Sequence, residues 1–537
     1  MANKPDPHYL VALMNCVFPG GGDPSPRRSD PPPHTPQHGI VDNYHVNVRT
    51  FPILDALAHI CVSQGGAQVV AIALQLDSQN QKIRLVLAEN TDVPGSLVDH
   101  LTSVWGKLQN LSDEYAKQRT KESENPLANS PPIPPKVANP LKIEIFCDIY
   151  QYSLEKQIKR IEKWSARLTD FIGDLLQRRA VDGLERLERN LYSATVALVL
   201  AAELVSRLDE DPENTLTDAE WETVYRQSMQ ANEHAKLVLD VDNGLDCENL
   251  ALEIHDDHPG DPFPLRRALR KLTSLPYHIE SLIGFAHSPR LRPALQYEMS
   301  IFPVPNQPRN VQLPTTLGQW KSFLEAAYGG HHPSQKAQAT KLSSRFRPRD
   351  KESSVHYKCP VHCECALIQY LQVKQHNDWD NIRAFNYIGV SKLSCRACCT
   401  WIEAFNEQGG PEFYTRGSHG KWYWPWGVPW EESLEEAEES LGEKMARKVY
   451  KEYLTQMRLP DPRRRRFADS SGVSSSGAEH HLADDDAARA TAESDMAVQK
   501  FGGNFNELAR AKLSRVQRRR GIPKGPGGQN EPGSSDI

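Results

Sequence analysis

The sequence of 537 residues contains no apolar run long enough to cross a membrane. Its longest one, Ala194 to Ala202, is far shorter than the ~20 residues that span a bilayer. Asn15 interrupts the apolar stretch near the N-terminus, and no small-residue cleavage site follows, so a secretion signal is not indicated. We therefore expect a cytoplasmic or nuclear protein with no membrane partner.

The chain also lacks a strong charge bias. Its formal net charge is −6, and its isoelectric point is about 6.4. A balance so close to neutral does not indicate a nucleic-acid-binding protein, although local basic patches stay open. Charge alone therefore leaves the class of partner undecided.

Cysteine is scarce for a chain of this length, and its placement is uneven. Six of the ten cysteines lie between Cys359 and Cys399, and the other four are scattered. Disulfide scaffolds are normally short, secreted and cysteine-dense, which this chain is not. A reduced, intracellular protein with one thiol-rich site fits better.

Composition and apolar periodicity divide the chain into six segments. They are a disordered segment rich in Pro, Gly and His (1–45), a helix and β-hairpin (46–118), a Pro-rich linker (119–141), a mostly helical region (142–340), the thiol-rich part (341–459) and a disordered low-complexity tail (460–537). The helical region has no fixed repeat period, so a helical solenoid is not indicated. It is either an accessory domain without chemistry or a domain that binds a protein partner. Arg463 to Arg466 are either a nuclear-import or nucleic-acid patch or a solvated charge run.

Two strands are predicted early in the chain. Residues 67–76 (AQVVAIALQL) and 82–90 (KIRLVLAEN) are separated by the polar turn DSQNQ, a pattern typical of a β-hairpin. Helical spacing of apolar residues precedes the hairpin and follows it at 94–118.

The thiol-rich part places its metal-binding side chains where helices begin. In KCPVHCECALIQYLQ, His362 comes just before a helical pattern. Residues 384–390 predict a buried strand, and after the short SKLS connection Cys395 and Cys398 open the next helix. Free N–H groups and the positive dipole end of a helix stabilise thiolates, which bind zinc. One imidazole and two thiolates would leave the fourth tetrahedral position of the ion for water.

Glu364 follows His362 by two positions, so both side chains can face one pocket without the carboxylate becoming a ligand. Zinc lowers the pKa of its bound water to ~7, and a neighbouring carboxylate can move the proton of that water. The combined signature, H-x-E followed by C-x-x-C, is that of the zinc-dependent nucleobase deaminases.

The stretches HCE and YIGVSKLSCRACC resemble the cytidine-deaminase-like superfamily, and within it the fungal branch related to bacterial toxin-type deaminases. The resemblance implies hydrolytic deamination of a nucleobase by zinc-bound hydroxide, with Zn²⁺ held by His362, Cys395 and Cys398 and with Glu364 as proton shuttle. Two departures are Ser394, where the superfamily usually has Pro, and Cys363, where it commonly has Ala. They affect the subfamily and the substrate more than the metal site.

The same resemblance implies a three-layer α/β/α domain of the α/β class. The residues immediately before His362 form no hairpin, so we infer that the domain is split, with the helical region inserted after the second strand. Asn90 at the end of that strand is a candidate substrate-binding residue, or else a turn-forming Asn. His419 is a second candidate. The implied substrate is a nucleoside, a nucleotide or a single-stranded nucleic acid.

Two other interpretations remain open. The first is a structural zinc module, in which Cys359, Cys363 or Cys365 joins Cys395 and Cys398 to close a four-ligand site. The second is a deaminase fold without activity, which serves as a scaffold. The aromatic cluster WYWPW, residues 422–426, either stacks a base or belongs to the core or a lid.

Overall fold

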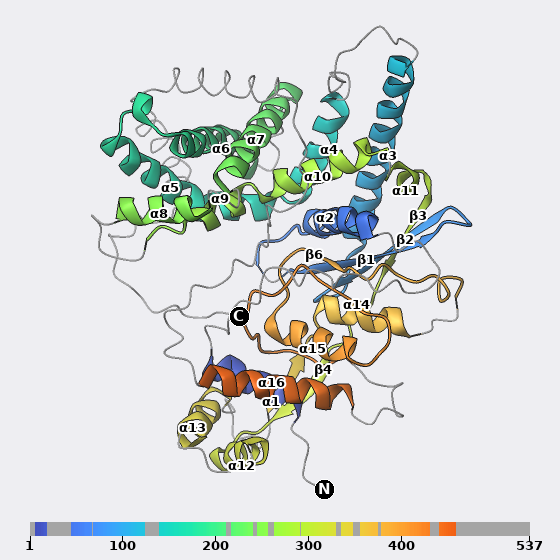
Figure 1. Cartoon of the computed structure of the whole chain (residues 1–537), viewed down its shortest axis with the longest axis vertical. Coiled ribbons are helices and arrows are strands. Elements are labelled where there is room, and N and C mark those ends of the chain that lie inside the picture. The colour runs from blue at the N-terminus through green and yellow to red at the C-terminus, as the bar shows by residue number, and fades with distance from the viewer. Residues whose placement is uncertain are drawn as a thin grey trace. The chain divides into compact units, whose positions relative to one another are not determined.

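The computed structural model describes residues 6–18, 44–66, 68–123, 139–210, 216–239, 244–255, 262–289, 291–328, 335–346, 355–373, 377–429 and 440–457. The chain divides into two compact units (Figure 1). Unit 1 comprises Met1–Lys156 and Tyr277–Ser474, and unit 2 comprises Gln157–Pro276 and Ser475–Ile537. The described chain is mixed α/β, mostly helical, with one small sheet and a separate strand pair.

The sheet of unit 1 is built around the predicted hairpin. Strand β1 (Val70–Asp77) pairs antiparallel with β2 (Lys82–Glu89) along its whole length. In the turn, the Asp77 carboxylate accepts hydrogen bonds from the backbone N–H groups of Gln79 and Asn80 at 3.1 and 3.0 Å. This Asp-led turn fixes the register, so alternate residues face opposite sides of the sheet.

Two short strands extend the hairpin to the order β3-β2-β1-β6. Strand β3 (Glu298–Pro303) runs parallel to β2. It lies in the region whose sequence pattern predicts mostly helix. Because β3 is short and lies at the edge of the sheet, where Pro is tolerated, apolar periodicity alone does not reveal it.

The strand predicted over 384–390 is shorter than its pattern indicates. Only β6 (Gly389–Val390) pairs regularly with β1, with one isolated bridge at Gln75 and Ala384. The Gln75 amide donates to the carbonyls of Trp379 and Ile382, at 3.3 and 2.7 Å, so the neighbouring segment turns away from the ladder.

Helices cover both faces of this sheet. Helix α2 (Tyr44–Ile60) lies on one side, and α14 (Cys363–Gln372) lies on the other (Figure 1). A Cβ on Gly389 would come within 2.3 Å of the Leu54 backbone, so only glycine permits this approach of α2 to β6. Asp55 of α2 accepts hydrogen bonds from the Val390 N–H at 3.0 Å and the Tyr387 hydroxyl at 2.7 Å.

Helix α1 (Pro7–Val17) corrects the prediction that residues 1–45 are disordered. Asp6 caps the helix through the N–H of His8. The apolar side chains of α1 are buried in the core of unit 1, against α13 (Gln335–Arg345) and α16 (Leu441–Met457). The partners that bury these side chains lie hundreds of residues away, so no local pattern announces them. Residues 1–5, 19–43, 124–138 and 458–537, which belong to the predicted disordered and linker segments, are outside the described residues.

A two-stranded sheet precedes the thiol-rich helices. Strand β4 (Arg309–Leu313) pairs antiparallel with β5 (Val355–Cys359). Helices α12 (Leu317–Tyr328) and α13 connect the two strands in the sequence. Helix α15 (Arg396–Asn406) packs against α16, the helix that follows it in the sequence. The remaining helices of unit 1 are α3 (Gly95–Ser123), α4 (Asn139–Tyr152) and α11 (Arg292–Gln296).

Unit 2 is helical throughout its described part. Its elements are α5 (Leu154–Arg178), η2 (Val181–Gly183), α6 (Arg186–Glu210), α7 (Asp218–Leu239), α8 (Gly244–His255) and α9 (Leu265–Leu272), and α10 (Ser274–His287) leads back to unit 1. Apolar faces of α5 to α9 share one core. Among the described helices, α6 alone is long and apolar enough to cross a membrane, but most of that stretch is buried, and the core helix of a globular domain meets the same criterion.

One half-buried histidine makes the stability of unit 1 depend on pH. His100 of α3 stacks on Tyr152 with ring centroids 3.8 Å apart, and burial lowers its pKa to about 4. Unfolding returns the group to an ordinary pKa near 6.5. As pH falls from 6.5 toward 4, only the unfolded chain takes up this proton, so stability is lost over that range.

We therefore expect His100→Gln to flatten the acid side of the stability profile. Between pH 7 and pH 5, the free energy of unfolding of the wild type should fall by about 2 kcal/mol more than that of the variant, as measured by urea unfolding. Comparing the two proteins at each pH cancels contributions from other titrating groups. Parallel profiles would show that His100 is not held neutral.

Candidate metal centre

Cys395 and Cys398 are positioned by the first turn of α15. Cys395 is the N-cap residue, with extended backbone (φ −72°, ψ 164°), and its sulfur accepts the N–H of Cys398 at 3.4 Å. The segment after β6 is held in place because the N–H of Ser394 donates to Gly417 at 3.0 Å, and that of Arg396 donates to Lys421 at 2.9 Å. Both thiols therefore point from one fixed helix end.

His362 occupies the matching position at α14. It is the N-cap residue (φ −66°, ψ 146°), and its carbonyl accepts the N–H groups of Cys365 and Ala366 at 3.0 and 2.9 Å. The side-chain oxygen of Asn90, at the end of β2, accepts the N–H of Cys363 at 3.0 Å. This bond satisfies a donor at the helix start that has no intrahelical partner.

The two helix starts bring three ligand atoms together. The Nδ1 atom of His362 lies 3.5 Å from Sγ of Cys395 and 3.3 Å from Sγ of Cys398, and the two sulfurs are 3.4 Å apart. Tetrahedral zinc with bonds of ~2.3 Å to sulfur and ~2.0 Å to nitrogen separates its ligands by ~3.5–3.8 Å. Within the part of the chain that the structure describes, these residues form the group that can hold a metal ion.

Burial sets the charge state of the thiols. It raises the pKa of Cys395 and of Cys398 well above the ordinary thiol value. The helix-end effect expected from the sequence is therefore outweighed by desolvation, and a cation is needed to hold both groups as thiolates. Burial opposes charge on His362, but the Cys395 sulfur and the Glu364 carboxylate together outweigh it, and the pKa of that imidazole is raised.

Glu364 lies beside the three ligand atoms without joining them. It sits in the first turn of α14, its side chain is buried, and its carboxylate accepts the thiol of Cys363 at 3.3 Å. Its charge also acts on His362 and Cys398, which places it in the same pocket. A carboxylate held next to a metal group, but outside it, can move protons.

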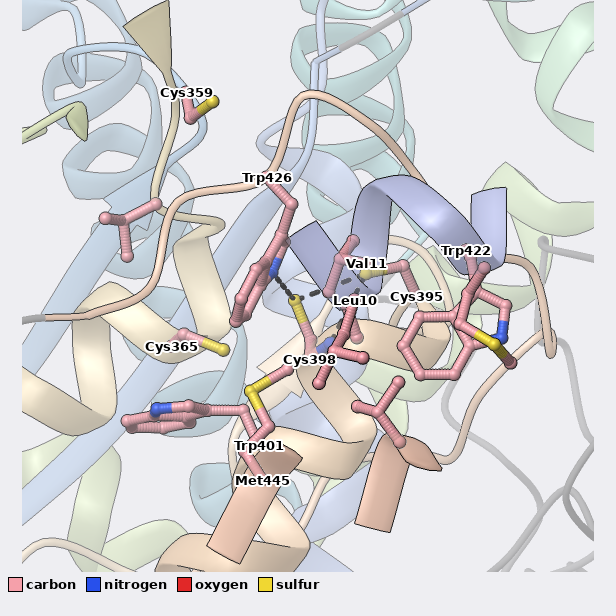
Figure 2. Packing of buried hydrophobic residues seen from close by; sticks show 14 of the residues in the cluster. Leu10, Val11, Cys359, Cys365, Cys395, Cys398, Trp401, Trp422, Trp426 and Met445 are labelled. Carbon is pink, nitrogen blue, oxygen red and sulfur yellow. Dashed lines mark hydrogen bonds between the residues drawn. The ribbon is translucent and has the colours of Figure 1, made fainter. Parts of the chain in front are cut away.

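The remaining cysteines of this part differ in their distance from the group. Cys359 ends β5 and lies apart from Cys395 and Cys398 (Figure 2). The thiol of Cys365 contacts Cys398, but it is not among the three residues whose ligand atoms are all mutually close. Cys363 is engaged by Glu364. The geometry therefore gathers three candidate ligands, and the Cys365 thiol contacts one of them.

His419 lies on the segment that runs beside the Cys395 turn. Its N–H donates to the carbonyl of Ser394 at 3.2 Å, and its Nδ1 accepts the N–H of Lys421 at 3.0 Å. Burial, with a contribution from Lys421, lowers the pKa of His419 to about 4. With Nδ1 accepting, the neutral ring carries its proton on Nε2 and is a hydrogen-bond donor there.

The aromatic cluster divides between core and surface. Trp422 and Trp426 are 2% and 0% exposed and belong to the core of unit 1, whereas Tyr423 is 45% exposed. The sequence suggested no individual role for Trp426, yet its indole N–H donates to the sulfur of Cys398 at 3.3 Å (Figure 2). Only the clustering of aromatics just downstream of C-x-x-C signalled this contact.

A family model matches part of the chain. Residues 361–430, which contain the whole group and its surroundings, match the family described as OTT_1508_deam-like deaminase. No curated protein and no solved structure matches the chain. The match supports a deaminase-like superfamily for this segment, and with the three-ligand group it supports a zinc deaminase-like protein.

We expect the purified protein to bind about one zinc ion per chain, and His362→Ala, Cys395→Ala and Cys398→Ala each to lose most of it. Cys399→Ala is the matched control, because that thiol faces Glu403 at 3.3 Å rather than the group. Zinc content is measured by plasma mass spectrometry after gel filtration. Loss of zinc from the control alone, or retention in all three ligand variants, would contradict the assignment.

Proposed function

We propose that this chain is a zinc-dependent hydrolytic deaminase that acts on a nucleobase of the cytosine or adenine type. The observation that carries the proposal is the buried carboxylate of Glu364, held beside a His–Cys–Cys group that it does not join. When bound, zinc would supply the Lewis acidity that makes water a nucleophile at neutral pH. The match of residues 361–430 to a deaminase family supports the same reaction.

Each of the four residues of the site has a defined part in this reaction. His362, Cys395 and Cys398 hold the ion. Glu364 accepts a proton from the attacking water and delivers it to a nitrogen of the base, so that water adds at the ring carbon and ammonia leaves. Burial of this carboxylate excludes bulk water, which would otherwise exchange the proton.

Two further residues are proposed to contact the substrate. The Asn90 side chain uses its oxygen to hold the start of α14, which leaves its amide N–H groups to donate. His419, with a pKa of about 4, stays neutral at physiological pH and offers a hydrogen bond rather than a charge. Neutral donors suit recognition of the carbonyl and ring-nitrogen acceptors of a base.

The proposal includes the substrate class, cellular location, fold and protein partner that the sequence suggested. The substrate is a nucleoside, a nucleotide or a single-stranded nucleic acid, and the protein acts in the cytoplasm or nucleus. The catalytic domain is a three-layer α/β/α deaminase fold of the fungal branch related to bacterial toxin-type deaminases. The helical region interrupts this fold and binds a protein partner.

A second candidate function rests on Cys365. Its sulfur contacts Cys398, so a modest shift would let it complete a four-ligand structural site without catalysis. Such a module, or an inactive deaminase fold used as a scaffold, gives the buried Glu364 no role. The deaminase gives Glu364 a role and is therefore preferred.

The activity is tested by ammonia release from nucleosides, nucleotides, single-stranded DNA and single-stranded RNA. Glu364→Gln should lower turnover by about 10²–10⁴-fold while keeping zinc, because the amide cannot carry the proton. Glu403→Gln, an exposed substitution on α15, is the matched control and should retain turnover. Equal release by wild type and Glu364→Gln would contradict the proposal.

A further inference from the structure

Trp426 donates a hydrogen bond to a predicted metal ligand. Its Nε1 lies 3.3 Å from Sγ of Cys398. An indole N–H can only donate, so the sulfur is the acceptor, and the bond strengthens when Cys398 becomes a thiolate. Trp426 is completely buried, so water cannot take the place of either partner.

The backbone around Trp426 is tied to the other half of the site. The backbone N–H of Trp426 donates to the Cys359 thiol, and the backbone N–H of Gly427 donates to the carbonyl of Pro360 at 2.8 Å. A Cβ on Gly427 would come within 2.7 Å of the Cys359 carbonyl, so the two segments are in close contact. Trp426 therefore connects the turn that carries His362 to the helix that carries Cys398.

Helix α1 packs close to the indole of Trp426. The N–H of Val428 donates to Nε2 of His8 at 3.1 Å, and the rings of His8 and Trp426 are 6.4 Å apart. Leu10 and Val11 of α1 belong to the same packed cluster as Trp426 (Figure 2). This packing keeps the N–H···S bond dry and in one orientation.

We propose that Trp426 is a positioning residue of the metal centre, whose indole N–H orients the Cys398 sulfur and withdraws part of its negative charge. The inference rests on the zinc site proposed above. Partners outside the ligand shell typically tune metal affinity by 10–100-fold. A thiolate that accepts a hydrogen bond also donates less charge, which leaves the ion a stronger Lewis acid.

The test compares Trp426→Phe with Trp422→Phe. Both remove an indole N–H from the core, but Nε1 of Trp422 has no hydrogen-bond partner among the described residues. Zinc affinity is measured by competition with a chromophoric chelator. We expect Trp426→Phe to weaken binding by about 10–100-fold, and Trp422→Phe to leave it unchanged.

Cobalt(II) substitution provides a spectroscopic readout. In Trp426→Phe the sulfur-to-cobalt charge-transfer band should move to longer wavelength, because the thiolate loses its hydrogen bond. Unchanged affinity and an unchanged band in Trp426→Phe would overturn the role of Trp426 while leaving the metal site intact. Failure of the wild-type protein to bind zinc or cobalt would overturn the metal site itself.

A measurement on the wild-type protein covers the case in which Trp426→Phe does not fold. With tryptophan labelled at the indole nitrogen, loading zinc should shift one N–H resonance and protect it from exchange. The Trp422→Phe variant should retain that resonance. If no indole resonance responds to zinc in a protein that binds it, the proposal is overturned.

Discussion

The meeting of two helix N-termini is the constraint on which the rest of this structure depends. His362 begins α14, Cys395 begins α15, and their ligand atoms approach to 3.5 Å. Two helix starts present free N–H groups and like dipole ends, which repel each other unless negative charge lies between them. Thiolates provide that charge, and buried thiols remain thiolates only beside a cation. A cation bound between the two helix starts would therefore stabilise the same arrangement that holds it.

The surroundings of the group fix both helices from several directions. Asn90 at the end of the hairpin holds the start of α14, and the segment 415–421 runs beside the turn that precedes α15. Trp426 donates a hydrogen bond to Cys398, and His8 of α1 accepts a hydrogen bond from the N–H of Val428. These contacts come from distant parts of the sequence and share one core. A ligand set supported in this way keeps its geometry without relying on loops alone.

Local chemistry made much of the site predictable from sequence. The hairpin was predicted from two strand patterns on either side of a polar turn. The three residues that can hold a metal ion were predicted from His and Cys placed at helix starts. The docking of α1 could not be predicted, because its apolar face is buried by residues near the other end of the chain. The pairing of β3 with β2 and of β4 with β5 was missed for the same reason, since each strand is short and its partner is distant. The bond from Trp426 to Cys398 depends on that long-range packing too.

The central claim is that the metal has three protein ligands and one open position. X-ray absorption of the zinc-loaded protein counts the neighbours of the ion directly. The account predicts two sulfurs at ~2.3 Å and two nitrogen or oxygen atoms at ~2.0–2.1 Å, of which one is His362 and one comes from solvent. Three or four sulfurs would mean that Cys365 or another thiol closes the site, and the deaminase assignment would then be wrong.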